Sequence, residues 1–228
     1  MLLQDLYDCS RPIMFEHDER PEYPYELFGS GFVAKYHDRR FLITARHVMR
    51  DRLPEQVRIY ADESFARSIP LDVQTKPTDV DPEDWHYGDI VVMGIKADML
   101  EDEEMACVDR LDLSGVRPAT PLSVGDRLFA TGFPSEDRWI DYDEKRFGFR
   151  RVVAAATYGG ASTSRDMHCM STFDCGEVKD RNGFSGSPVF RIVRRERFVV
   201  ANFAGMMTLG SFFLGANVIY DILDAITR

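Results

Sequence analysis

The chain has few cysteines, no long apolar run and no excess of basic residues. It contains four cysteines in 228 residues, none of them in a CxxC pair, so the spacing fits no common zinc site. No stretch approaches 18 apolar residues, so no membrane-spanning helix is expected. The net charge of −10 argues against broad binding to nucleic-acid phosphates. We interpret the arginines between positions 191 and 197 as a solvated turn between strands.

The first residues, MLLQDLYDCSRP, lack the basic segment and the apolar stretch of a secretory signal. Together with the scarcity of cysteine, this favours a reducing cytoplasm. Cys169 and Cys175 could form a bridge, although their spacing does not require one. His168 beside Cys169 is a weak hint of metal binding, and a strand residue next to a buried thiol is the preferred interpretation. No metal and no organic cofactor is expected.

Short segments of alternating or apolar residues, separated by turn residues, predict many strands and few helices. The predicted strands are 31–36, 40–44, 56–60, 89–95, 127–132, 149–157, 169–173, 188–193 and 198–207. Hydrophobic residues make up 44% of the chain, which is enough for a sizeable core in a protein of this length. The pattern predicts an all-β sandwich or barrel.

The C-terminal segment has a different pattern. Asn217 can cap a helix, and the apolar residues that follow it recur on one helical face. We expect this helix to pack against the body of the protein. Two other stretches, 76–84 and 97–118, have the composition of linkers or surface loops, and the second is expected to connect two halves of a barrel fold.

The segment NGFSGSPV places Ser185 between Gly183 and Gly186. Glycine adopts backbone angles that other residues resist, so such a turn can point successive N–H groups into one concavity. A concavity of this kind would bind a developing oxyanion. Because a serine hydroxyl is a poor nucleophile without a base, this interpretation needs a histidine and a group that orients it.

Two further segments supply those groups. His47 follows the apolar run FLITA, where a strand end would hold it rigidly yet leave it accessible. Asp89 opens an apolar strand, and a partly buried carboxylate there needs a donor such as a histidine N–H. The other histidines, at positions 17, 37, 86 and 168, lie in turns, in charged surroundings or in a strand. Each pattern alone is more often structural, and the order His, Asp, Ser is what indicates catalysis.

In that order, the segments TARHV, YGDIVV and GFSGSPV resemble the trypsin/chymotrypsin-like serine peptidases, in their disulfide-poor bacterial and viral form. The resemblance runs from about Gly29 to the C-terminal helix. It implies an all-β fold of two six-stranded antiparallel β-barrels with the active site between them, followed by the C-terminal α-helix. The whole chain, 1–228, would be one peptidase domain, with one barrel over about 1–110 and the second barrel and helix over about 119–228.

The resemblance also implies an endopeptidase and assigns roles to residues. Ser185 would be the nucleophile, His47 the general base, and Asp89 the group that orients the imidazole. The N–H groups of Gly183 and Ser185 would form the oxyanion hole. Substrate would pair with residues 208–210 as an added strand, with Thr208 near the catalytic aspartate. The residues implied to bind substrate are Lys179, Thr208, Leu209, Gly210 and Gly215.

The chain departs from the family in three places. Val48 stands where secreted members carry a disulfide cysteine. Phe184 stands where members that are activated by N-terminal trimming carry an aspartate, so such activation is not expected. The oxyanion loop is then either preformed or ordered by substrate or a partner. Counting back from the nucleophile puts Lys179 at the pocket floor, favouring an acidic substrate side chain, whereas a shift of one residue puts Asp180 there; both could also be solvated loop charges.

Two other classes of protein compete with an endopeptidase. A catalytically silent or partner-activated peptide-binding module on the same fold is the alternative, and the retention of all three triad residue types weighs against it. An α/β-hydrolase is excluded because its order is Ser, Asp, His and because Pro188 prevents a helix after the serine. The expected partners are a protein or peptide substrate and a regulatory protein, with neither nucleic acid nor membrane.

Overall fold

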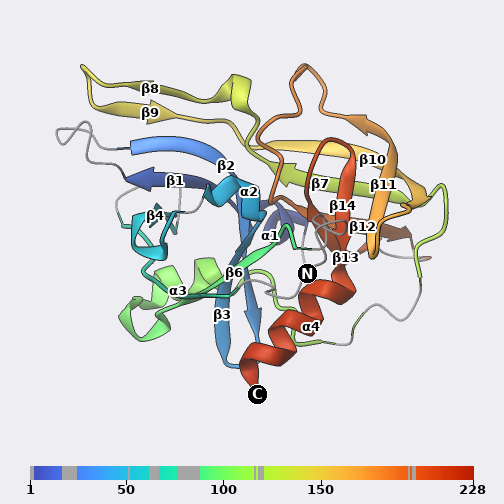
Figure 1. The fold of residues 1–228 in the computed structure, drawn as a ribbon, viewed down its shortest axis with the longest axis horizontal. Helices are drawn as coiled ribbons and strands as arrows, with labels where there is room; N and C mark the ends of the chain where they lie inside the picture. The colour runs from blue at the N-terminus through green and yellow to red at the C-terminus, as the bar shows by residue number, and fades with distance from the viewer. Residues whose placement is uncertain are drawn as a thin grey trace.

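The computed structural model describes residues 3–16, 25–50, 52–61, 67–75, 88–115, 117, 121–194, 196 and 199–228. The expectations for His17, His86, residues 76–84, residues 195 and 197, and part of 97–118 lie outside these ranges. Strands predominate and divide between two six-stranded antiparallel barrels, the first nearly closed and the second closed (Figure 1).

The first barrel has the strand order β4-β1-β2-β3-β6-β5. Its strands are β1 (Ser10–Glu16), β2 (Tyr25–Tyr36), β3 (Arg39–Thr44), β4 (Val57–Arg58), β5 (Leu71–Thr75) and β6 (Val91–Ile95). The short helix α1 (Leu3–Asp8) precedes β1, and α2 (Arg46–Met49) follows β3. The two edges of the sheet approach each other where the N–H of Ile69 donates to the carbonyl of Ile59 at 2.8 Å.

The second barrel closes in the order β10-β11-β14-β13-β12-β7. Its strands are β7 (Arg127–Gly132), β10 (Val152–Ala161), β11 (Met167–Asp174), β12 (Pro188–Arg194), β13 (Val199–Met207) and β14 (Phe212–Gly215). A separate two-stranded hairpin, β8 (Trp139–Asp141) and β9 (Arg146–Gly148), leaves this barrel between β7 and β10 and extends along β2 (Figure 1).

The stretch 97–118, expected to be a linker, contains regular structure. A 3-10 turn (Ala97–Met99) is followed by the helix α3 (Asp102–Val108). The acidic residues that suggested a solvated loop instead occupy the first helical turn, where negative charge favours the helix dipole. The side chain of Glu104 accepts a hydrogen bond from the N–H of Glu101 at 2.9 Å, and Val108 is buried. The prediction of an irregular loop was therefore wrong for this part, although the segment does lie between β6 (Val91–Ile95) of the first barrel and the second barrel.

The predicted C-terminal helix is present as α4 (Ala216–Thr227), with Val218, Ile219, Tyr220 and Leu223 buried. Its N-cap is Gly215, not Asn217 as expected. Asn217 lies inside the first turn, and its side-chain amide donates to the carboxylate of Asp166 at 2.7 Å. The helix runs from below β13 and β14 to the lower end of β3 (Figure 1).

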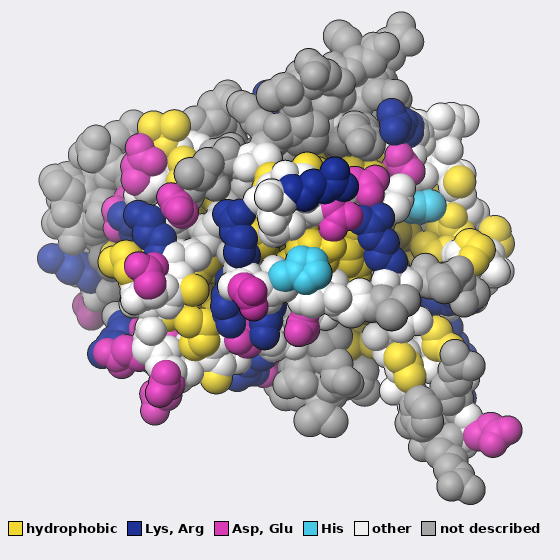
Figure 2. Space-filling view, turned by 90° about the horizontal axis from the view of Figure 1, so that it is seen from below, with side chains coloured by type: hydrophobic (Ala, Val, Ile, Leu, Met, Phe, Trp, Pro, Cys, Tyr) yellow, Lys and Arg dark blue, Asp and Glu magenta, His cyan; other side chains and the backbone are white. Residues whose placement is uncertain are grey.

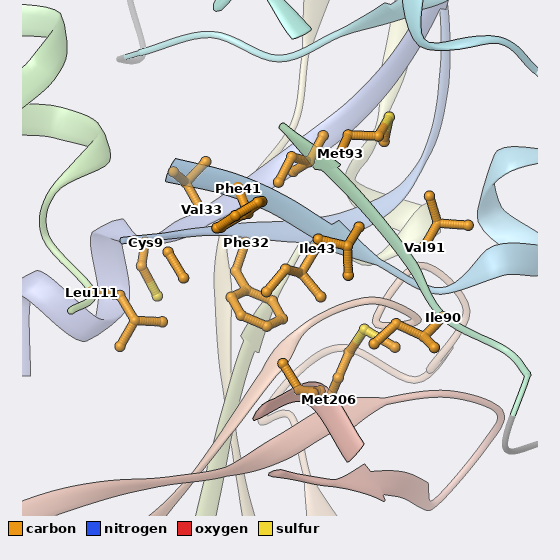
Figure 3. Close-up of a cluster of buried hydrophobic side chains, with 14 of the residues drawn as sticks. Cys9, Phe32, Val33, Phe41, Ile43, Ile90, Val91, Met93, Leu111 and Met206 are labelled. Carbon is orange, nitrogen blue, oxygen red and sulfur yellow. The ribbon is translucent and has the colours of Figure 1, made fainter. Parts of the chain in front are cut away.

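The main hydrophobic core joins the two barrels. Phe32, Ile43, Val91 and Met206 belong to one buried cluster, although Met206 comes from β13 of the second barrel. Figure 3 shows Met206 beside Ile43 and Ile90 of the first barrel. A second, smaller cluster fills the second barrel around Leu128, Ala154 and Phe213. The shared core fixes the barrels against each other, so a site between them is held rigidly.

Cationic and anionic side chains alternate over the face that carries α4 (Figure 2). Arg117, for example, forms ion pairs with Asp221 and Asp224 of α4. Of the helices in the described ranges, none is both long and apolar enough to cross a membrane.

Candidate active site

The pairing of β3 with β6 brings two of the predicted residues together. In this antiparallel pair Thr44 lies opposite Val91. Residues that follow β3 and residues that precede β6 therefore emerge at the same end of the sheet. His47, in the helical turn α2 just after β3, meets Asp89, just before β6.

The carboxylate of Asp89 holds His47 at two points. Its oxygens lie 2.8 and 3.0 Å from Nδ1 of the imidazole, and Oδ1 also accepts the backbone N–H of His47 at 3.0 Å. The Asp89 side chain is 4% exposed, whereas that of His47 is 41% exposed. Because an ionised carboxylate only accepts hydrogen bonds, it selects the tautomer with the proton on Nδ1. Nε2 is then left as a free base on the accessible side.

Ser185 lies on a loop shaped by two glycines. Gly183 has φ +96° and Gly186 has φ +87°, a region that strongly favours glycine. A Cβ on Gly186 would lie only 1.9 Å from the carbonyl oxygen of Ser30. The glycines around the serine are thus required both by the backbone angles and by close contact with the first barrel.

The hydroxyl of Ser185 donates to the backbone carbonyl of Thr208 at 2.6 Å. Within the described residues, no hydrogen bond joins Ser185 to His47. The structure therefore pairs His47 with Asp89 and leaves the Ser185 hydroxyl bonded to Thr208, just after the end of β13. Catalytic hydrogen bonds are often long before substrate binds and tighten in the complex with substrate.

The backbone of the loop leaves two donors free. The carbonyl of Asn182 accepts the N–H of Ser135 at 2.8 Å. Since the carbonyl and N–H of a trans peptide point in opposite directions, the N–H of Gly183 faces away from Ser135. Neither the Gly183 N–H nor the Ser185 N–H has an acceptor within the described part of the chain. Free adjacent donors of this kind are what an oxyanion site requires.

Ser30, which the sequence analysis did not single out, fixes this loop from the first barrel. Its N–H donates to the carbonyl of Ser185 at 3.1 Å. Its hydroxyl donates to the carbonyl of Gly183 at 2.6 Å and accepts the N–H of Phe133 at 2.9 Å. The only sequence signal was the pair of glycines that flank Ser30 in FGSGF.

Two side chains of the loop anchor it within the second barrel. Phe184 is 1% exposed and packs edge-on against Phe173, with ring centroids 5.3 Å apart. Arg181 donates to the hydroxyl of Ser211 at 2.6 Å, which ties the loop to the turn between β13 and β14. Apolar packing and one hydrogen bond therefore anchor the loop. Position 184 holds a phenylalanine, so it offers no carboxylate for the ion pair that activates trimmed members of the resembled family.

The predicted substrate-binding residues fall into different environments. Thr208 is buried, its N–H donating to the carbonyl of Phe212 at 3.0 Å, and its hydroxyl points to that same carbonyl rather than to Asp89. Leu209 is 53% exposed, and Gly210 has φ +64° in the tight turn that follows. Gly215 pairs with Gly205 at the start of α4.

Lys179 is exposed, and its backbone N–H donates to the carboxylate of Glu136 at 2.9 Å. Its place at the floor of the specificity pocket stays a prediction, and the exposed side chain argues against it. Asp180 accepts hydrogen bonds from the backbone and side chain of Asn182 at 2.9 and 3.1 Å. The loop around these two residues is therefore built from its own polar contacts.

His168 and Cys169 lie on β11 but form no metal site. The Nδ1 of His168 is 2.9 Å from the hydroxyl of Tyr158, and its ring stacks on Phe213. Burial lowers the pKa of His168, an effect partly opposed by Asp166. Across the described ranges, no group of three or more histidine, cysteine or acidic side chains could hold a metal ion. All four cysteines are free thiols, so Cys169 and Cys175 are not bridged.

A comparison with protein families decides the relationship. The family model of the trypsin-like peptidase domain matches residues 29–199, from β2 to the start of β13. The chain belongs to this family. The match includes the segments around His47, Asp89 and Ser185. No curated protein matches the chain.

Solved structures share the chymotrypsin-like fold of the family at low identity. An inactivated protease paralogue of the scabies mite is 14% identical to this chain and has a TM-score of 0.62. The alignment covers 96% of this chain and 92% of the paralogue. Human heparin binding protein is 14% identical to this chain and has a TM-score of 0.55, and the alignment covers 97% of this chain and 92% of that protein. These likenesses establish the fold of this trypsin-like domain and nothing about its activity.

Proposed function

We propose that the protein is a serine endopeptidase that hydrolyses peptide bonds through an acyl-enzyme intermediate, with His47, Asp89 and Ser185 as its catalytic triad. The observation that carries the proposal is the contact between the buried Asp89 carboxylate and Nδ1 of a half-exposed His47. A carboxylate buried against a histidine fixes one tautomer and stabilises the charge that the ring gains when it takes a proton. The family relationship supports a protease-like function.

The mechanism begins with a rotation of Ser185. Its hydroxyl leaves the carbonyl of Thr208, a hydrogen bond of 2.6 Å, and turns toward Nε2 of His47. Oγ then bonds to the carbonyl carbon of the scissile peptide while its proton passes to Nε2. The substrate carbonyl oxygen becomes an oxyanion that accepts the N–H groups of Gly183 and Ser185. Each such donor contributes about 3 kcal/mol to the barrier reduction in well-studied cases.

The remaining steps regenerate the serine. The C–N bond breaks, and Nε2 of His47 gives its proton to the leaving amine. Water then attacks the acyl ester, passing a proton to His47. The C–O bond to Ser185 breaks, the carboxylic acid leaves, and Oγ takes back the proton.

A catalytically silent or partner-activated peptide-binding module is the second candidate. One observation favours it: the Ser185 hydroxyl is engaged by Thr208 and not by His47. One of the structural neighbours is itself an inactivated protease paralogue. On this alternative, a regulatory partner would have to release the hydroxyl before the triad can act.

We place the enzyme in the cytoplasm as part of the same proposal. Four free thiols are compatible with a reducing cytoplasm, in keeping with a disulfide-poor, bacterial type of peptidase. The substrate is a protein or peptide, and the net charge of −10 gives no support to nucleic acid or an anionic membrane surface as a partner.

Peptide cleavage tests this function. The protein is incubated with a diverse peptide mixture, and new termini are identified by mass spectrometry. We expect internal cleavage by the wild type, none by Ser185→Ala, and a transient mass increase on the protein from the acyl-enzyme. Binding of peptides without any cleavage, by a folded wild type, would instead support the silent module.

A further inference from the structure

A polar pocket of about 420 Å³ lies beside the nucleophile loop. Residues 26–28 of β2, Arg50, Ser135 and residues 138–140 line it. Arg50 ends the helical turn that carries His47. Residues 138–140 begin the hairpin β8–β9, which extends along β2 and away from β13 and β14 (Figure 1). The pocket thus borders both halves of the candidate active site.

Arg138 places a positive charge in the pocket, and no carboxylate of the described residues forms an ion pair with it. Its guanidinium is half-buried and donates to the carbonyl of Pro134 at 3.3 Å and to the hydroxyl of Ser135 at 2.5 Å. Among the described residues, no carboxylate lies within ion-pair distance of it. Burial lowers the pKa of Arg138 to about 10, with Asp180 opposing the shift, so the group stays cationic at neutral pH. A guanidinium has five N–H donors, and most of these remain available.

Arg50 brings a second cation to the same pocket. Its guanidinium lies over the ring of Phe28, 3.7 Å from the centroid, and pairs with no acid in the described ranges. The acidic residue that lines the pocket, Glu26, faces Arg52 at 3.8 Å. The pocket therefore carries an excess of positive charge, which an anionic group would complement.

The position of the pocket identifies the part of a substrate that would reach it. A Cβ on Gly183 would lie 2.4 Å from Nη2 of Arg138, so this cation borders the proposed oxyanion hole. Thr208, whose carbonyl accepts the Ser185 hydroxyl, follows β13, which lies away from the hairpin β8–β9 (Figure 1), and the acyl part of a substrate is expected to pair there. A chain crossing Ser185 from that flank would next enter the pocket.

We propose that Arg50 and Arg138 form a subsite for an acidic side chain on the leaving-group side of the scissile bond. The assignment rests on the proposed peptidase function, because only a cleaved peptide has a leaving group. The planar guanidinium of Arg138 would bind the carboxylate in bidentate fashion, and Arg50 would add charge from the opposite wall.

Matched peptide substrates test this subsite. Starting from a sequence that the wild type cleaves, glutamate is compared with glutamine at each of the first three positions after the cut. We expect glutamate to raise kcat/KM about tenfold at one of them, and the gain to shrink at high salt. Arg138→Gln and Arg50→Gln should each reduce the glutamate advantage. Arg146→Gln is the control, because this exposed arginine lies on the same hairpin outside the pocket and should leave the advantage unchanged.

Two results would overturn the subsite in an active enzyme. One is equal cleavage of the glutamate and glutamine peptides at all three positions. The other is an Arg138→Gln variant that slows both members of a pair equally, which would mean a role in catalysis or folding and none in selection. Circular dichroism checks the fold, and Arg50→Gln serves if Arg138→Gln does not fold.

A binding experiment separates this proposal from the peptidase function. The Ser185→Ala protein is titrated with a blocked Ala-Glu-Glu-Ala peptide and with its glutamine counterpart. Trp139, which lines the pocket and is 53% exposed, reports binding by its fluorescence, and Trp139→Phe assigns the signal. About tenfold tighter binding of the glutamate peptide, lost when both arginines are replaced by glutamine, is expected. Equal binding refutes the subsite. Preferential binding with no cleavage by the wild type keeps a site for acidic side chains at the two arginines but refutes the peptidase function, and with it the assignment of the site to the leaving group.

Discussion

The carboxylate of Asp89 accepts hydrogen bonds from both the ring and the backbone N–H of His47. The ring contacts are 2.8 and 3.0 Å and the backbone contact is 3.0 Å. The orientation of the imidazole and the position of the helical turn that carries it therefore depend on one buried side chain. Both contacts are possible because the register of β3 against β6 brings His47 and Asp89 to the same end of the sheet.

Asp89→Asn should preserve the fold and remove most of the activity. An amide can donate to Nδ1, which would place the ring proton on Nε2 and leave no base for Ser185. We expect kcat to fall about 10⁴-fold with little change in KM. Steady-state cleavage of a reporter peptide measures the loss. A fall of less than tenfold would mean that Asp89 only supports the structure.

Ser30→Ala should weaken both stability and reactivity. Removal of the hydroxyl leaves the Gly183 carbonyl and the Phe133 N–H without a partner, at a cost of about 1–3 kcal/mol in the free energy of unfolding. Because the oxyanion donors then lose their support, the rate at which Ser185 is acylated should fall about tenfold to a hundredfold. Urea unfolding and stopped-flow acylation give the two quantities.

Ser10→Ala is the matched control for that variant. Ser10 is also fully buried, and its hydroxyl donates at 2.9 Å to the carbonyl of Thr131, which is not part of the nucleophile loop. It should lose a similar free energy of unfolding and keep the wild-type acylation rate. Equal loss of rate in both variants would show that Ser30 affects the site only through global stability.

Gly186→Ala should be far more damaging than Gly176→Ala. Both glycines have positive φ, +87° and +67°, so both substitutions carry backbone strain of about 1 kcal/mol. Gly176 faces open space, whereas a Cβ on Gly186 would lie 1.9 Å from the carbonyl oxygen of Ser30. We expect Gly186→Ala to lose at least about 3 kcal/mol in chemical unfolding. Similar losses for the two variants would contradict the close packing of the barrels at this point.

His168 should make the protein less stable in mild acid. Burial lowers its pKa, so below about pH 6.5 the unfolded chain binds a proton that the folded chain resists. Stability from this group is complete above the unfolded pKa and declines as the pH falls toward the folded one. The melting temperature of the wild type should therefore drop more between about pH 7.5 and about pH 5 than that of His168→Gln. The exposed His37→Gln serves as control, and parallel curves for all three proteins would exclude the effect.

Local sequence pattern predicted most of the strands. The segments 31–36 and 40–44 form the β2–β3 hairpin, and residues 127–132 form β7 with the predicted bounds. These segments have clear alternation or apolar runs between turn residues. β1, by contrast, contains Arg11 and Pro12, and β14 has only four residues, so neither has a recognisable period. Helix α3 was missed because its acidic first turn has the composition of a solvated loop.

In the candidate site, too, local sequence segments reveal some residues, whereas others are placed only by contacts between distant parts of the chain. The glycines around Ser185, and the strand ends that carry His47 and Asp89, are visible in local segments. Ser30 and Arg138 are not, because each meets the nucleophile loop only through contacts between residues far apart in the chain. The hydrogen bond from Ser185 to the Thr208 carbonyl also depends on a side-chain rotamer, which no sequence pattern specifies.

Labelling with a fluorophosphonate probe tests the central claim most directly, because the probe bonds covalently only to an activated serine. Wild type, Ser185→Ala and His47→Ala are compared, and the labelled peptide is mapped by mass spectrometry. The proposed triad predicts labelling of the wild type at Ser185 and none in either variant. A folded wild type that stays unlabelled, or that is labelled equally without His47, would contradict it.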